Sequence, residues 1–309
     1  MTGLSVGVDV GGTKIAAGRV GESGSLVDRV EVPTPRDPDA IVTAIGEVVT
    51  ELVGRGECRS VGLAVAGFVA QDRRTVQFAA NLGWRDLDVA TRIERVGLRV
   101  VVENDANAAA WAEYVVGAGR DSADMLMVTV GTGIGGGFII GGDLVRGAHG
   151  DAAEIGHITF ERDGLPCRCG RRGCWEQYAS GTALVRRTRL AAQSDPAASA
   201  LIEHAGGEVD AIQGAMVTDL ALAGDAFSLR MLQDLGRDLG EGIASMCSVL
   251  DPDLVVVGGG VATAGDILLT PLREVLAASI TGGGSRPIPR VVAAALGNDA
   301  GIVGAALLS

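Results

Sequence analysis

The feature that most constrains the fold is a pattern that occurs twice: an alternating apolar strand, a glycine turn and a second strand. The matching positions have identical spacing in the two copies: Leu4, Val6, Val8 and Gly11 in the first, and Leu126, Val128, Val130 and Gly133 in the second. Asp9 of the first copy corresponds to Gly131 of the second. This repeat predicts a duplicated unit, with one copy in each of two domains.

Glycine turns of this kind let backbone N–H groups approach an anion, because no Cβ stands in the way. Two such turns facing each other would bind a polyphosphate from both sides. The alternative is that both are ordinary hairpin turns, but their repetition favours phosphate binding. Two better-known motifs do not apply. Thr13 and Lys14 stand in the wrong order for a Walker A loop, and a strand rather than a helix is expected after the GTGIGG segment at Gly131.

The rest of the chain predicts an α/β protein in which a three-stranded meander is followed by parallel crossovers. Apolar periodicity indicates these further elements: a strand over 25–35, a helix over 38–56, a strand over 59–67, a short helix over 87–97, a strand over 98–104 and a helix over 106–117. A third glycine cluster, at 258–260, lies between a strand and a helix, where a nucleoside could lie against the backbone. Residues 297–309 predict a capped helix.

Charge and composition disfavour several classes of protein. A net charge of −12 argues against nucleic acid as the main partner. The chain has no run of 18 apolar residues, and its N-terminus MTGLSVGVDV lacks a basic segment, so we expect neither a membrane span nor a signal peptide. The odd number of cysteines, five, is typical of the reducing cytoplasm, where clustered cysteines more often bind metal than form disulfides.

Three of those cysteines lie within eight residues, in the segment CRCGRRGCWE: Cys167, Cys169 and Cys174. Disulfides are the alternative, but Cys167 and Cys169 are too close in sequence to pair without strain. His157, ten residues before Cys167, completes a Cys₃His set that suits tetrahedral zinc. The sequence therefore predicts a zinc site, and the two remaining cysteines are expected to be buried apolar side chains.

A pair of polar residues, Asn104 and Asp105, stands where a strand is expected to end and a helix to begin. One of them is expected to be the helix N-cap, because both residue types are favoured there. The other is free for chemistry, since ligands of open α/β sheets bind at strand ends. A carboxylate at this place could accept the proton of a substrate hydroxyl during phosphoryl transfer.

Six segments, in this order, resemble the ROK family of repressors and sugar kinases: DVGGTK, ENDANAAAWAE, GTGIGGG, EIGH, CRCGRRGCWE and GNDAG. They extend from Asp9 to Gly301 and so cover essentially the whole chain. Each segment is loose by itself, but the ordered set is specific. Within the family the resemblance is strongest to ATP-dependent glucokinases of the actinobacterial type. One departure is Trp175, where many members carry leucine.

The resemblance implies an actin-like ATPase fold of the hexokinase and ribonuclease H-like type, with two α/β domains and a central cleft. We expect a small domain at 1–112 plus 297–309 and a large domain with the zinc loop at 113–296. The implied activity is phosphorylation of glucose to glucose 6-phosphate by ATP with Mg²⁺. The expected partners are a sugar and a nucleotide only, in a cytoplasmic homodimer or homotetramer.

The resemblance also implies the roles of individual residues. Asp105 would be the general base on the sugar 6-hydroxyl. The residues expected to bind the sugar are Asn81, Asn104, Asp105, Glu154, His157 and Glu176. Those expected to face the phosphates are Gly11, Gly12, Thr13, Lys14, Thr132 and Gly133, with Asp9 helping to position Mg²⁺ and Gly259 and Gly260 against the adenosine. Structural zinc would be held by His157, Cys167, Cys169 and Cys174, in a loop that delivers Glu176 to the sugar.

Three other functions remain open at this point. The chain could phosphorylate another sugar, such as N-acetylmannosamine or fructose, or use polyphosphate as the donor. It could be a sugar-responsive repressor, but the first strand begins near Leu4 and leaves no room for the N-terminal helix-turn-helix of that branch. A noncatalytic sugar sensor is disfavoured, because Asp105 and both phosphate turns are intact.

Overall fold

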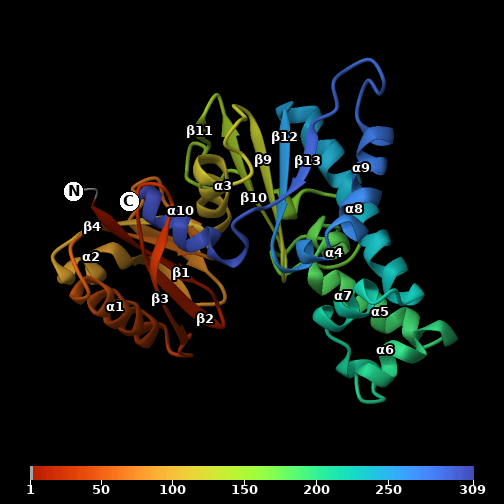
Figure 1. The fold of residues 1–309 in the computed structure, drawn as a ribbon, viewed down its shortest axis with the longest axis horizontal. Helices are drawn as coiled ribbons and strands as arrows, with labels where there is room; N and C mark the ends of the chain where they lie inside the picture. The colour runs from red at the N-terminus through yellow and green to blue at the C-terminus, as the bar shows by residue number, and fades with distance from the viewer. Residues whose placement is uncertain (1–2) are drawn as a thin grey trace. The chain divides into compact units, whose positions relative to one another are not determined.

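The computed structural model describes residues 3–309, which pack as two compact units (Figure 1). Unit 1 consists of the chain up to residue 127 together with 137–153 and 295–309, and unit 2 consists of 128–136 and 154–294. A division by packing is not a division into domains, so the domain boundaries expected at 112 and 297 stay a prediction.

Unit 1 contains a five-stranded sheet with the strand order β3-β2-β1-β4-β8. Its strands are β1 (Leu4–Val10), β2 (Lys14–Val20), β3 (Leu26–Pro33), β4 (Cys58–Val65) and β8 (Arg99–Asn104). The first three form an antiparallel meander, whereas β4 pairs in parallel with both β1 and β8. The predicted meander followed by parallel crossovers is confirmed.

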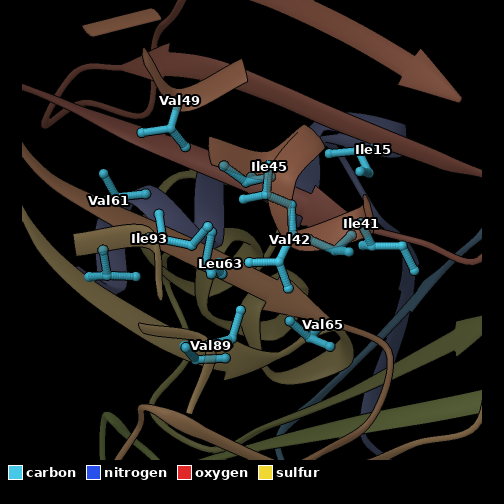
Figure 2. Packing of buried hydrophobic residues seen from close by; sticks show 14 of the residues in the cluster. Ile15, Ile41, Val42, Ile45, Val49, Val61, Leu63, Val65, Val89 and Ile93 are labelled. Carbon is cyan, nitrogen blue, oxygen red and sulfur yellow. The ribbon is translucent and has the colours of Figure 1, made fainter. Parts of the chain in front are cut away.

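The helices that pack on this sheet are α1 (Pro38–Gly54), α2 (Val89–Ile93), α3 (Asp105–Val116) and α10 (Ala300–Leu308). Helix α1 begins at a strong N-cap, because the Asp37 side chain accepts hydrogen bonds from two backbone amides and Pro38 follows it. Its apolar residues recur with helical spacing and are buried. Figure 2 shows Ile41, Ile45 and their neighbours directed toward side chains of β2, β4 and α2.

The other face of the sheet is built from small residues, because α10 approaches the strands very closely. A Cβ at Gly62 of β4 would lie 1.8 Å from the carbonyl oxygen of Ala305, and a Cβ at Gly7 of β1 would lie 1.9 Å from that of Ile302. Strand residues alternate between faces, so β1 and β4 carry large apolar residues toward α1 and a glycine toward α10. The predicted C-terminal helix is confirmed, after a 3₁₀ turn at Gly297–Asp299, but the predicted cap is not: Asp299 occupies the N-cap position without a capping hydrogen bond from its side chain.

This contact gives a stability prediction. Overpacking a well-packed contact costs about 1–3 kcal/mol, and in Gly62→Ala the methyl group would overlap backbone that cannot move aside. We therefore expect the free energy of unfolding to fall by about 3 kcal/mol or more, measured by urea denaturation. The matched control is Gly46→Ala in α1, where a Cβ meets nothing within 4 Å. That change is expected to raise stability by about 0.5–1 kcal/mol. Equal stability of the two variants would contradict the prediction.

A small antiparallel sheet in unit 1 was missing from the expectation. It contains β5 (Phe68–Val69), β6 (Thr75–Ala79) and β7 (Trp84–Asp88). The short helix expected over 87–97 begins later, at Val89, and continues as a 3₁₀ turn at Glu94–Val96. These strands are too short and too polar to produce a clear alternation in the sequence.

A second five-stranded sheet has the strand order β11-β10-β9-β12-β13. Its strands are β9 (Met125–Val130), β10 (Ile134–Ile140), β11 (Asp143–Leu144), β12 (Leu254–Gly258) and β13 (Arg290–Ala293). Because β9 and β10 are the second copy of the repeat, the prediction that a strand follows those glycines is confirmed. The third glycine cluster also lies as predicted, between β12 and a helical segment.

The helices of unit 2 are α4 (Glu176–Ala179), α5 (Gly181–Ala192), α6 (Ser199–His204), α7 (Gly214–Leu222), α8 (Ala226–Leu250) and α9 (Asp266–Ser279). The long helix α8 packs against α9 and α7. A search of residues 3–309 finds no helix whose length and apolarity would allow it to cross a membrane.

Candidate functional site

Asn104 and Asp105 lie at the junction between β8 and α3. Asn104 is the N-cap of α3: its Oδ1 accepts a hydrogen bond from the backbone N of Asn107 at 3.0 Å, and its Nδ2 donates to the carbonyl of Gly67 at 3.2 Å. Asp105 is the first residue of the helix, and its Oδ1 accepts from the backbone N of Ala106 at 2.9 Å. The prediction that one member of the pair caps the helix is therefore confirmed, and the cap is Asn104.

Two carboxylates of unit 1 influence each other across the sheet. Burial raises the pKa of Asp105 to about 6. Burial and repulsion by Asp105 raise the pKa of Asp9, at the end of β1, to about 7, although Lys14 opposes that shift. Lys14 itself forms an ion pair with Glu31 at 3.1 Å. Asp105 is thus a half-buried acid with a pKa of about 6, within the range that suits a general base.

The first glycine turn, Gly11–Thr13, joins β1 to β2. The N–H of Gly11 donates to the carbonyl of Lys14 at 3.0 Å. The amides of Gly12 and Thr13 form no hydrogen bond within residues 3–309. A Cβ at Gly12 would lie 3.1 Å from the Cβ of Asn81, so Asn81 stands beside the turn. The turn therefore presents free backbone donors next to a polar side chain, as an anion site requires.

The second glycine turn, at residues 131–133, is tied to the start of α5. The N–H of Gly181 donates to the carbonyl of Gly131 at 2.8 Å, and the Thr182 hydroxyl donates to the carbonyl of Thr132 at 2.6 Å. The N–H of Gly131 donates to the carbonyl of Gly133 at 3.0 Å. The positive end of the α5 dipole thus lies at this turn, which favours an anion there.

A cavity of about 1020 Å³ opens beside the second turn, entirely within unit 2. Gly131 and Thr132 line it together with α5, α7 and the segment that begins at Gly260, and Val185 and Val261 give it apolar walls. Gly259 adopts φ +87°, and a Cβ there would lie 2.5 Å from a carbonyl oxygen of β9. Polar donors at one end and apolar walls along the length fit a nucleotide.

The four predicted zinc ligands converge in unit 2. The ligand atoms of His157, Cys167, Cys169 and Cys174 all lie within 4.8 Å of one another. His157 Nδ1 is 3.7 Å from Cys167 Sγ, and the sulfurs of Cys169 and Cys174 are 3.6 Å apart. A tetrahedron with Zn–S bonds of about 2.3 Å has edges of about 3.8 Å. The four donor atoms, one from the histidine and three from the cysteines, therefore fit one zinc ion. The three cysteines form no disulfide.

The acidic residues predicted to bind the sugar surround His157. Its Nε2 is 4.0 Å from Glu154 Oε2, and its Nδ1 is 3.8 Å from Glu176 Oε1. Glu176 Oε1 also lies 3.0 Å from Cys167 Sγ. A Cβ at Gly133 would lie 2.6 Å from Glu176 Oε2, so Glu176 stands directly beside the second glycine turn. The cysteine cluster, the acidic pair and the turn thus form one continuous surface of unit 2.

Trp175, between the last cysteine of the cluster and Glu176, anchors this surface to α8. Its indole is fully buried, and Nε1 donates to the carbonyl of Asp238 at 2.9 Å. A Cβ at Gly242 would lie 2.0 Å from the indole ring, so the helix has a groove where the ring enters. The backbone N–H of Trp175 donates to the carbonyl of Ile158 at 3.0 Å. The position of Glu176 is therefore fixed from both sides of the loop.

The predicted site residues divide between the two units. Unit 1 holds Asp9, Gly11, Gly12, Thr13, Lys14, Asn81, Asn104 and Asp105. Unit 2 holds Thr132, Gly133, Glu154, His157, Cys167, Cys169, Cys174, Glu176, Gly259 and Gly260. The sequence analysis did not identify the cavity walls from α5 and α7, including Thr182 and Thr218. The only signal for them was the strong turn-to-helix start at Gly181, which resembles many ordinary helix starts.

With this geometry in view, the fold and the site define the class of protein. Residues 5–309 match the ROK family, and the chain belongs to that family. Its fold is accordingly the actin-like ATPase fold that the sequence predicted.

Three relatives illustrate the similarity. The chain is 47% identical to the glucokinase of Streptomyces coelicolor, with 99% of this chain and 98% of the relative covered. It is 35% identical to the N-acetylmannosamine kinase of Yersinia pestis, with 99% and 98% covered. Among solved structures, the ROK family glucokinase of Streptomyces griseus in complex with glucose and AMPPNP superposes with a TM-score of 0.93 at 47% identity, covering 99% of each chain.

Proposed function

We propose that this protein is a glucokinase that transfers the γ-phosphoryl group of ATP to the 6-hydroxyl of glucose. The observation that carries the proposal is Asp105: a half-buried carboxylate at the start of α3, with its pKa raised to about 6, in a chain whose full-length relatives include glucokinases. A base of this kind is largely ionised at pH 7 yet basic enough to accept a hydroxyl proton.

The proposed step at the sugar is proton transfer from the 6-hydroxyl to Asp105 as the oxygen attacks the γ-phosphorus. The bond from this phosphorus to the β,γ-bridging oxygen breaks, and ADP leaves with that oxygen. Asn104 is held by its capping bond, and Asn81 by its place beside the first glycine turn. Both side chains, with Glu154, His157 and Glu176 of unit 2, are proposed to bind the remaining sugar hydroxyls. Charged and amide acceptors of this kind discriminate strongly between sugars that differ in one hydroxyl.

The donor is proposed to be ATP. The unit 2 cavity supports this, because its apolar walls suit an adenosine that lies against Gly259 and Gly260. Thr132 and Gly133, beside the start of α5, would bind phosphate oxygens, and the free amides of Gly12 and Thr13 with Lys14 would bind others. Catalysis of phosphoryl transfer consists mainly of such positioning and charge stabilisation.

Magnesium and zinc have different proposed roles. Asp105 repels Asp9, and a divalent cation held by the Asp9 carboxylate would relieve that repulsion, since Mg²⁺ prefers oxygen ligands. When bound, Mg²⁺ would neutralise charge on the phosphates. Zinc, held by His157 and the three cysteines, would fix the loop that ends at Glu176 and has no step in the reaction. The homodimer or homotetramer and the cytoplasmic location stay predictions.

A panel of sugars tests the proposal. We expect ADP release with ATP and glucose, and a kcat/KM for glucose at least about tenfold above that for N-acetylmannosamine or fructose, because a mismatched sugar leaves hydrogen-bonding groups of the site unpaired. The measurement is a coupled ADP assay, with ³¹P NMR to identify the 6-phosphate. If no sugar of the panel stimulates ADP release, the assignment as a sugar kinase is contradicted.

N-acetylmannosamine kinase is the second candidate, because a full-length relative at 35% identity has that name. The same panel distinguishes the two candidates. A higher kcat/KM for N-acetylmannosamine than for glucose would make N-acetylmannosamine the assigned substrate, and the assignment as a kinase would stand. A parallel series with polyphosphate in place of ATP tests the donor. We expect no turnover with polyphosphate, because it has no adenosine group to contact the apolar walls of the cavity.

A further inference from the structure

Directly before Asn104, the side chain of Glu103 is buried with only 4% of its surface exposed. A carboxylate removed from water is tolerated only when it is paired and hydrogen-bonded. Its Oε2 accepts a hydrogen bond from Arg146 Nε at 2.7 Å, and Arg73 Nε lies 3.6 Å from the same oxygen. All these residues belong to unit 1, but the two arginines come from segments far from Glu103 in the sequence.

The other carboxylate oxygen of Glu103 is bound to the start of α3. Oε1 accepts from the Asn107 Nδ2 at 3.1 Å and from the backbone N of Asn104 at 3.2 Å. Asn104 in turn accepts from the backbone N of Asn107 through its own side chain. Asn107 is therefore held twice, by Glu103 at its side chain and by Asn104 at its backbone. Asp105 lies between these two attachments.

The arginines are themselves fixed to other elements. The carbonyl of Arg73 accepts from the backbone N of Val102 in β8 at 2.9 Å, and its Nη2 donates to the carbonyl of Leu308 in α10 at 3.0 Å. The carbonyl of Arg146 accepts from the backbone N of Ala152 at 3.1 Å. Glu103 thus connects the start of α3 to the turn between β5 and β6, to α10 and to the segment after β11.

We propose that Glu103, paired with Arg146, is a positioning residue that fixes the first turn of α3 and so the direction in which Asp105 presents its carboxylate. The inference rests on the proposed function, since it takes Asp105 as the base. Glu103 acts only through Asn104, Asn107 and the backbone. Arg146 balances the charge of Glu103, so that a second unpaired negative charge does not stand two residues from Asp105 in a site for phosphates.

Glu103→Gln is the first test. A glutamine keeps the shape, but one of the two accepting oxygens becomes an NH₂ group, which must face either Arg146 or the Asn107 side-chain amide, both of them donors. We expect kcat to fall about 10- to 100-fold, since misplacement of a reacting group by about 1 Å costs up to about 100-fold. The KM for ATP should stay within about twofold, because the nucleotide cavity belongs to unit 2. Each variant is assayed well below its melting temperature, and circular dichroism gives its folded fraction.

Arg146→Met and the double variant Glu103→Gln/Arg146→Met complete a double-mutant cycle. Either single change leaves a buried polar group without its partner, whereas the double change removes both members. We expect the double variant to lose no more kcat than the worse single variant, instead of the product of the two losses. The matched control is Glu94→Gln, because Arg74 and Glu94 form a two-point ion pair in the same unit, at 2.8 and 2.9 Å, without contact to α3. It should leave kcat unchanged.

The possible outcomes are distinct. A Glu103→Gln protein with wild-type kcat, or with a loss equal to its loss of folded protein, overturns the positioning role. A cycle in which the two losses multiply overturns the coupling to Arg146. If the wild-type protein phosphorylates no sugar, the proposed function fails, and if Asp105→Asn keeps its activity, the role of Asp105 as the base fails; both results are obtained before any Glu103 variant is made.

Discussion

Replacement of Asp105 by asparagine is expected to reduce kcat by about 10²–10⁴-fold or more, the range typical of removing a general base. The amide has nearly the same shape and can still accept the hydrogen bond from Ala106, so α3 should begin at the same residue. It cannot accept the proton of a sugar hydroxyl. Glucose should therefore still bind, with a weakened Kd measurable by calorimetry.

The control for this variant is Asp37→Asn, a change of the same kind at the N-cap of α1, where asparagine caps as well as aspartate. Its kcat should match the wild type. The pH profile gives an independent reading: because burial raises the pKa of Asp105 to about 6, the base is protonated below that pH. Wild-type kcat/KM should fall toward tenfold per pH unit as pH drops below about 6. A near-normal kcat in Asp105→Asn would exclude this residue as the base.

Loss of zinc is the second large effect. Cys174→Ala removes one of four donors two residues before Glu176, so the end of the loop should loosen first. We expect the purified variant to contain little or no zinc by elemental analysis, and its glucose KM to rise on the order of tenfold or more, as positioning of Glu176 is lost. Nucleotide affinity should change little, because no cluster residue lines the cavity.

Cys247→Ala is the matched control, since Cys247 is an equally buried free thiol of the same unit, on α8. It should lower the melting temperature while zinc content and glucose KM stay at wild-type values. If a zinc-free Cys174→Ala protein keeps its glucose affinity, the metal stabilises the fold only and does not position the sugar-binding residues.

Features of the fold and the site that are made by residues close together in the sequence could be predicted, whereas those made by residues far apart could not. The repeated strand, glycine turn and strand could be predicted because apolar residues alternate within each strand and glycine at the turn has a clear physical reason, although the two copies lie far apart in the chain. The cysteine cluster was visible because most of its members lie within eight residues. A cap at Asn104 or Asp105, and the helix after it, could be predicted because a strand, a polar pair and an apolar helix follow one another directly, but the sequence left open which of the two residues is the cap.

Features made by distant residues were not visible. Glu103 reads as an ordinary polar residue at a strand end, and its partner Arg146 is 43 residues away, in a segment without periodicity. The walls of the unit 2 cavity come in part from α5 and α7, whose sequences show only ordinary helical patterns. The small sheet of β5, β6 and β7 escaped because strands of two to five residues give too little alternation to recognise.

The contact between Trp175 and Gly242 constrains how these two positions can change during evolution. Alanine at position 242 would clash with the indole, so it fits only when position 175 carries a smaller side chain such as leucine. Leucine at position 175 with glycine still at 242 would leave a cavity. Each single step therefore passes through a less stable protein, and only the pair of changes restores the contact. The two positions, 67 residues apart, should be inherited together, with glycine at 242 wherever tryptophan stands at 175.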